Sequence, residues 1–101
     1  MPAELAHQWF QYLRGSRLIL NVNSYDMASP AGTAGGNVVV NGTEIDFFNG
    51  HPCDVPPPGG VGKYMWRIAG GRLYLTALNT DPCGRSDELP DPVGWTPTNT
   101  P

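Results

Sequence analysis

Apolar and polar positions alternate on both sides of Gly70-Gly71, between Gly62 and Leu78. A two-residue glycine turn pairs Ala69 with Arg72, and this pairing fixes the register of the hairpin. Because side chains alternate across a strand, one face of the hairpin is apolar almost throughout. That face carries Tyr64, Trp66, Ile68, Leu73, Leu75 and Ala77, and the opposite face is mixed. The pattern predicts an antiparallel hairpin that turns one side toward a core or a cavity.

A second hairpin is predicted between Asn37 and Phe48, around Asn41-Gly42. Both turn residues tolerate positive φ, which the tight turns of hairpins require. The resulting register places one set of side chains together on a mainly apolar face: Val38, Val40, Thr43, Ile45 and Phe47. The other face carries Asn37, Val39, Glu44, Asp46 and Phe48.

The rest of the chain gives weaker signals. Residues 17–24 alternate as one more strand. Residues 25–36 are small and glycine-rich, and we expect a loop or a poorly regular edge strand there. Residues 79–96 form a turn-rich segment with a short strand near Trp95. Leu5, Trp9 and Leu13 recur at helical spacing before Gly15, which predicts one short helix over residues 4–13.

Sequential hairpins favour an all-β fold, an antiparallel up-and-down sheet curled into a barrel or half-barrel. The barrel strands are expected over about residues 17–78, capped by the short N-terminal helix. The 101 residues make one domain, residues 1–101, with a modest core.

Charge and composition narrow the possible partners. The net charge is −3, and six basic residues are too few for a surface that tracks nucleic-acid phosphates. No segment approaches the length of a membrane span, and the N-terminal residues lack the pattern of a signal peptide. We therefore expect a cytoplasmic protein that binds neither nucleic acid nor membrane. Two cysteines and two histidines lack metal-site spacing, so no metal or cofactor is expected.

The two cysteines, Cys53 and Cys83, flank the central hairpin. A disulfide between them would close a loop of about thirty residues. In the chain-entropy model this cross-link would stabilise the folded protein by about 3–4 kcal/mol. A cytoplasmic location argues against that bond. Both states remain open from the sequence.

Several motifs occur in a fixed order along the second half of the chain. They are Gly-x-Tyr-x-Trp at 62–66, the Gly-Gly turn with Leu-x-Leu at 73–75, Asp-Pro-Cys-Gly-Arg at 81–85, then Leu89 and Trp95. On these motifs, residues 37–95 resemble small actinobacterial lipocalin-like (calycin-type) proteins. The resemblance implies an eight-stranded barrel with an open mouth and a small hydrophobic ligand inside. Some relatives of this shape are cyclases of natural-product pathways, and others only bind.

The chain departs from this pattern in its N-terminal helix and in its short length. A complete barrel would need irregular strands from residues 25–36, or a second copy of the chain. With a second copy, the exposed strand edges of two chains would pair in a homodimer.

Candidate site residues come mainly from the two hairpins. The expected ligand-binding residues are Tyr64, Trp66, Phe47, Phe48, Leu73, Tyr74, Leu75 and Arg85. Tyr64 and Trp66 each join a polar atom to a large apolar body. The alternative is that these side chains simply fill the core, as in most small barrels.

Asp46 and Tyr64 are the candidate catalytic residues. A carboxyl inside a barrel has its pKa raised by desolvation and can move a proton, whereas on an outer face it is merely solvated. Arg85 is expected to tie down the return loop or to bind an anionic head group.

Three functions remain open. The first is binding of a small hydrophobic, polyketide-like molecule, and the second is a cyclase or isomerase that folds such a substrate. The third is a structural or interaction domain with a filled core.

Overall fold

The computed structural model describes residues 2–11, 15–30, 32–51, 60–81, 83, 89–90 and 92–97; Phe10, Gln11 and His51 are described by their backbones only. A 3-10 turn, η1 (Ala3–Leu5), precedes the strands. The strands are β1 (Gln8–Gln11), β2 (Ser16–Leu20), β3 (Ser24–Ser29), β4 (Gly32–Asn41), β5 (Glu44–His51), β6 (Gly62–Ala69), β7 (Arg72–Ala77) and β8 (Thr96–Pro97).

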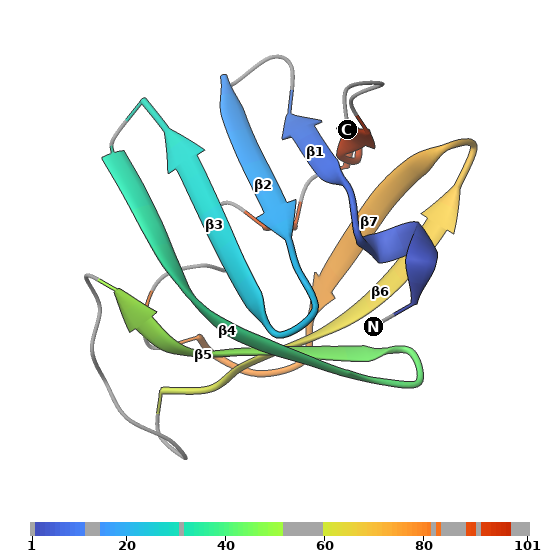
Figure 1. Cartoon of the computed structure of the whole chain (residues 1–101). Helices are drawn as coiled ribbons and strands as arrows, with labels where there is room; N and C mark the ends of the chain where they lie inside the picture. The colour runs from blue at the N-terminus through green and yellow to red at the C-terminus, as the bar shows by residue number, and fades with distance from the viewer. Residues whose placement is uncertain are drawn as a thin grey trace.

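The eight strands form one antiparallel sheet in the order β7-β6-β5-β4-β3-β2-β1-β8. From β1 to β7 each strand pairs with its neighbour along the chain, and β8 returns to pair with β1. Figure 1 shows β1 to β4 side by side in front of β6 and β7. The sequence prediction of an all-β, up-and-down barrel is confirmed, and one chain supplies all eight strands.

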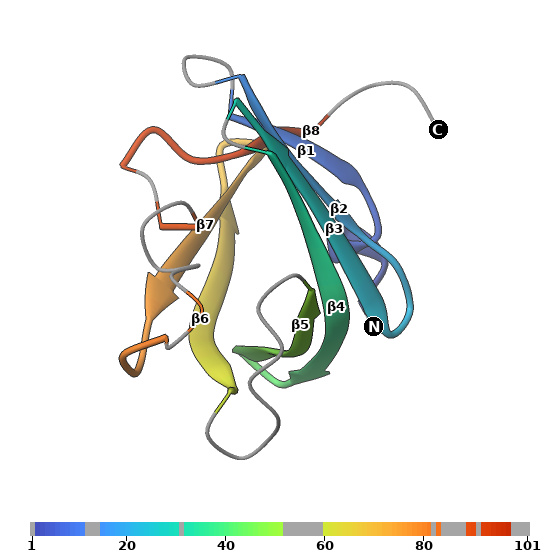
Figure 2. The same cartoon turned by 90° about the vertical axis from the view of Figure 1, so that its left-hand side faces the viewer.

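One residue pair brings the two edges of the sheet together. Leu73 of β7 and Trp95, just before β8, exchange two backbone hydrogen bonds of 2.8 Å. Figure 2 shows the result from the side, with β1 to β4 as one wall, β6 and β7 as the other, and β8 at the upper junction. Because β7 and the β8 segment join only over this short stretch among the described residues, the barrel is nearly closed.

Both predicted hairpins form, and the one around Gly70-Gly71 has the expected register, with Ala69 paired with Arg72. In the other hairpin the turn lies one residue later than expected, at Gly42-Thr43, so Asn41 pairs with Glu44. The apolar face keeps its expected members except Thr43, which lies in the turn. Gly42, Gly70 and Gly71 all have positive φ, as tight turns require.

The predicted helix over residues 4–13 is wrong. Only η1 is helical there, and Gln8–Gln11 form β1, while residues 12–14 lie outside the described residues. Leu5 and Trp9 are both buried, as the helical pattern required. Their burial does not require a helix, because Leu5 lies in η1 and Trp9 in β1, and both belong to the core. The strand wins because β1 gains ladder hydrogen bonds to both β2 and β8, whereas a helix of ten residues is marginal by itself.

Of the two alternatives for residues 25–36, a loop or an irregular strand, the strand is confirmed, because the segment contains all of β3 but its first residue and the first half of β4. Its small residues allow backbones to approach closely. A methyl group at Gly36 would lie 2.6 Å from the Phe48 carbonyl oxygen and 2.8 Å from that of Asn49. The register of β4 against β5 shifts between Gly35 and Asn37, a β-bulge of the kind that bends a strand.

Candidate functional site

The inward-facing residues that the sequence proposed as cavity lining form the core of the barrel. Phe47, Tyr64 and Leu73 are each 0% exposed, so no void large enough for a water molecule touches them. Phe47 meets the rings of Tyr25 and Tyr64 edge to face, with centroids 4.9 and 5.5 Å apart. The middle of the barrel is therefore filled by its own side chains, as eight-stranded barrels allow.

Tyr64 is held by a carboxylate from the return segment. Its hydroxyl donates to Asp81 Oδ2 over 2.7 Å in a buried setting, and the Cys83 backbone N–H donates to Asp81 Oδ1 over 2.9 Å. A methyl group at Gly62 would collide with the same carboxylate. Asp81 thereby ties the return segment to β6.

Trp66 and Leu75 differ in burial. Trp66 is half-buried and packs against the core, and its indole N–H donates to the Gly42 carbonyl over 2.9 Å. Leu75 is buried on the inner face of β7. Trp66 thus presents part of an apolar ring to solvent while its polar atom is already satisfied.

Asp46, Phe48 and Tyr74 lie on the outer face instead. Asp46 stands opposite Lys63 on β6, whereas its neighbour Ile45 stands opposite Tyr64. Asp46 and Tyr64 therefore face opposite sides of one sheet, and the structure does not bring the two candidate catalytic residues together. Tyr74 is half-buried under the Arg67 guanidinium, which lies 4.3 Å from the ring centroid.

Asp46 has an unusual environment for an outward-facing residue. Its Oδ1 atom is buried and has no hydrogen-bond partner among the described residues. Burial, followed by the hydrogen bond and charge of Glu44, raises the pKa of Asp46 to about 6, against a lowering by Lys63. The carboxyl can therefore gain or lose a proton near neutral pH.

Of Arg85, Cys53 and Cys83, only Cys83 lies within the described residues. Arg85 and Cys53 lie outside the described residues. Cys83 is disulfide-bonded, and the sequence contains one other cysteine.

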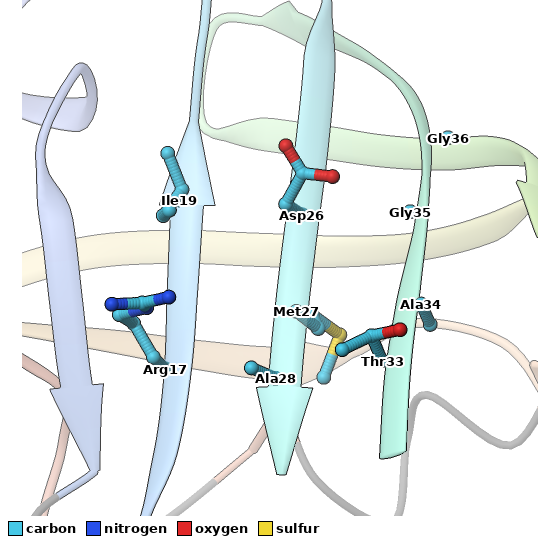
Figure 3. A pocket seen from close by; sticks show the side chains of 9 residues that line it. All are labelled: Arg17, Ile19, Asp26, Met27, Ala28, Thr33, Ala34, Gly35 and Gly36. Atoms are coloured by element: carbon cyan, nitrogen blue, oxygen red, sulfur yellow. The ribbon is translucent and has the colours of Figure 1, made fainter.

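A groove that the sequence did not suggest lies on the outer face of β2, β3 and β4 (Figure 3). Its volume is about 420 Å³, within the range of small-molecule sites. Two cross-strand rows make up its surface: Arg17, Ala28 and Thr33 in one, Ile19, Asp26 and Gly35 in the other. Met27, Ala34 and Gly36 complete the lining.

The groove exists because small residues stand between larger ones. Ala28 and Gly35 have little or no side chain, whereas the longer side chains of Arg17, Ile19 and Thr33 surround them (Figure 3). The Asp26 carboxylate leans toward β4, and a methyl group at Gly35 would lie 3.0 Å from its Oδ1. Gly35 therefore leaves the space that this carboxylate occupies.

Opposite charges border the groove. Arg17 and Asp26 are both exposed, and neither forms an ion pair with another described residue. They are diagonal neighbours across β2 and β3, a placement that separates two residues by about 7–8 Å. One border can receive an anion and the other a hydrogen-bond donor, with an apolar floor between them.

The described residues contain no cluster of three or more histidine, cysteine or acidic side chains fit to hold a metal ion. In the same part of the chain, no helix has the length and apolar character needed to span a membrane. Comparison of the chain with protein-family models, curated proteins and solved structures finds no match.

Proposed function

We propose that the protein binds a small, largely apolar organic acid in the outer groove of β2, β3 and β4. The observation that carries this proposal is the Arg17 guanidinium, which has no ion pair among the described residues, at the border of a cavity whose floor includes Ala28 and Gly35. Arg17 would bind the ligand carboxylate with charge-assisted hydrogen bonds. The Asp26 carboxylate would accept a hydrogen bond from a hydroxyl or amine at the other end.

The choice of the groove over the barrel interior follows from packing. The side chains that would have to line an internal site are fully buried against one another. A ligand there would have to displace packed core, at a cost of several kcal/mol. The outer groove needs no such displacement.

The architecture supports a ligand-binding role in general terms. The chain has the strand number and the up-and-down order of the lipocalin-like proteins that its motifs resemble. Fold alone does not specify a ligand, so the proposal rests on the groove residues. A cyclase role is not favoured, because Asp46 and Tyr64 lie on opposite faces of the sheet.

NMR titration of isotope-labelled protein with a panel of apolar carboxylic acids tests the proposal. For a ligand of about 15 non-hydrogen atoms, ordinary ligand efficiency gives a Kd on the order of 0.1–1 mM. Amide shifts are expected at Ile19, Ala28 and Gly35. The primary amide of the best acid should bind about 5–10-fold more weakly, because it cannot form the charge-assisted pair.

Two variants complete this test. Arg17→Gln should weaken the acid about 5–10-fold and leave its amide unchanged. Lys63→Gln removes an equal charge on the other wall of the barrel and should change neither affinity. Shifts that map to the core, or an acid that binds Arg17→Gln as well as the parent, would reject the outer site.

The disulfide bears on where the protein works. The sequence favoured the cytoplasm, but a bonded Cys83 fits an oxidising compartment better, because cytosolic thiols are kept reduced. We expect no free thiol in protein taken from its own cells under alkylating conditions. Alkylation of both cysteines would show free thiols and would indicate a reducing compartment instead.

A further inference from the structure

The outer face of the barrel between β4 and β7 carries apolar and charged side chains in a symmetric order. One row across this face consists of Val39, Asp46, Lys63 and Leu78. Leu78 belongs to the row because it directly follows β7 and its backbone N–H donates to the Lys63 carbonyl over 2.8 Å. Val39 is 49% exposed and Leu78 is 50% exposed. Apolar side chains therefore end the row on both sides, and two opposite charges lie at its centre.

The two central strands of this face carry opposite charges. β5 directs Glu44 and Asp46 outward, and β6 directs Lys63 and Arg67 outward. Glu44 and Asp46 share a hydrogen bond. Lys63 and Arg67 are exposed and form no ion pair with a described residue. The face thus presents an acidic strand beside a basic one, and the two basic side chains are free to meet an acidic surface.

This face is separate from the small-molecule groove. Figure 1 shows the hairpin of β4 and β5 beside β6, at the lower side of the barrel. The face includes the second half of β4, whereas the groove is lined by residues 33–36 of its first half together with β2 and β3. None of the four residues of the row lines that groove. The two surfaces can therefore be tested independently.

A two-fold axis makes this face complementary to itself. The axis lies in the plane of contact and runs along the strands, between β5 and β6. It places β5 of one copy on β6 of the other, so Asp46 meets Lys63 of the partner subunit. It also places β4 on β7, so Val39 meets Leu78 of the partner subunit. Sheets packed face to face keep their strands within about 30° of each other, and each contact occurs twice in such an isologous interface.

The size of the face sets the strength of this contact. Four strands about 4.8 Å apart, with five residues of about 3.4 Å each, give a face of roughly 19 by 17 Å. Its projected area of roughly 300 Å² is smaller than the roughly 800 Å² that each partner buries in a standard interface. The contact should therefore be weak and reversible, with a Kd on the order of 0.1 mM.

We propose that the outer face of β4 to β7 binds a second copy of this chain and forms a two-fold symmetric dimer. The sequence left a homodimer open through pairing of strand edges, whereas this dimer uses a sheet face. A second copy fits better than an unrelated partner, because a single axis brings both the charged and the apolar positions into matching pairs. A partner of one charge, such as nucleic acid, would meet like charge on half of the face.

Sedimentation velocity between about 10 μM and about 1 mM tests the proposal. The measurement is made at pH 7.5, above the pKa of about 6 of Asp46, so that this carboxylate is charged. The average mass of the parent protein should rise from one chain toward two. Leu78→Lys brings an ammonium group against Val39 of the partner subunit and should weaken association about tenfold. Val22→Lys is the matched control and should associate like the parent, because Val22 is 80% exposed between β2 and β3, outside the face.

A charge exchange tests the symmetry of the contact. Lys63→Asp places carboxylates opposite each other, and Asp46→Lys places ammonium groups opposite each other. Each variant alone should therefore remain monomeric at about 1 mM. An equimolar mixture should form a heterodimer with a Kd within about threefold of the parent value, because both central contacts then pair opposite charges. If Asp46→Lys does not fold, concentration-dependent amide shifts of the parent decide, and they are expected at Val39, Asp46, Lys63 and Leu78.

Four results would overturn the proposal. They are a single-chain mass of the parent at about 1 mM, undiminished association of Leu78→Lys, a mixture of the two folded charge variants that stays monomeric, and amide shifts confined to another surface. Shifts along the β7 edge, in particular, would show a dimer made by strand pairing.

Discussion

The hairpins β3–β4 and β6–β7 have the same topology but are specified in different ways. β6–β7 carries large apolar side chains on one face and a two-glycine turn, and its register follows from local sequence alone. β3–β4 is built largely from serine, alanine and glycine, and its register depends on close contact with its neighbours. The β6–β7 hairpin is stabilised by packing of its large side chains. The β3–β4 hairpin depends on glycine positions where a side chain would collide with neighbouring backbone.

Removal of a side chain should therefore damage β6–β7 most. Leu73→Ala takes a fully buried leucine from the strand that closes the barrel, and we expect a loss of about 2–5 kcal/mol in the free energy of unfolding. Urea unfolding at pH 7 measures it. Leu78→Ala, on an exposed position next to the same strand, should change stability by less than about 0.5 kcal/mol. Equal losses at the two positions would contradict the packed interior.

Addition of a methyl group should damage β3–β4 in the same way. Gly36→Ala forces a carbon against two backbone carbonyl oxygens that cannot turn aside, and we expect a cost of about 1–3 kcal/mol. Ala69→Val adds two methyl groups at an exposed position of β6 and should be tolerated within about 0.5 kcal/mol. Thermal unfolding of both variants provides the comparison. A neutral Gly36→Ala would mean that the β4 bulge is adjustable.

The smallest effect is expected at β5, the strand that joins the two hairpins. The pKa of Asp46 is raised from 3.8 to about 6, so the folded protein holds this proton more tightly than the unfolded chain does. Its contribution to stability is complete below pH 3.8 and is lost as pH rises through about 6. Because Asp46 is only half-buried, solvent screening limits the loss to on the order of 1 kcal/mol.

Asp46→Asn removes this dependence. The variant should be more stable than the parent at pH 7.5 and equal to it below pH 4, as urea midpoints at the two pH values would show. An advantage that is the same at both values would assign the effect to packing instead of charge.

The sequence predicted those parts of the fold that local rules control. Turn chemistry at Asn41-Gly42 and Gly70-Gly71 and the alternation around each turn were sufficient for two hairpins. The strand β1 was missed because Leu5 and Trp9 are spaced as on one face of a helix, although Leu5 lies in η1 and Trp9 in β1. For β3 the sequence left a loop and an irregular strand open, because small residues give little periodic signal and their role is visible only beside β2 and β4.

The candidate sites were predictable to a smaller degree. The apolar faces identified core residues correctly, but hydrophobicity does not distinguish a filled barrel from a hollow one. The groove residues Arg17, Asp26 and Gly35 are each unremarkable in sequence. They meet only because the registers of β2, β3 and β4 align them across three strands. Small residues flanked by charged ones across neighbouring strands can be recognised as a groove only once the strand register is known.

The pairing of β1 with β8 has a consequence for synthesis of the protein. The ribosome delivers Trp9 long before it delivers its partner Pro97, and at ordinary translation rates the interval is roughly 4–18 s. Until then one edge of β1 has no partner, and the Leu73–Trp95 bridge cannot form either. The nascent chain can assemble β2 to β7 hairpin by hairpin, but the barrel closes only after the β8 segment has left the exit tunnel.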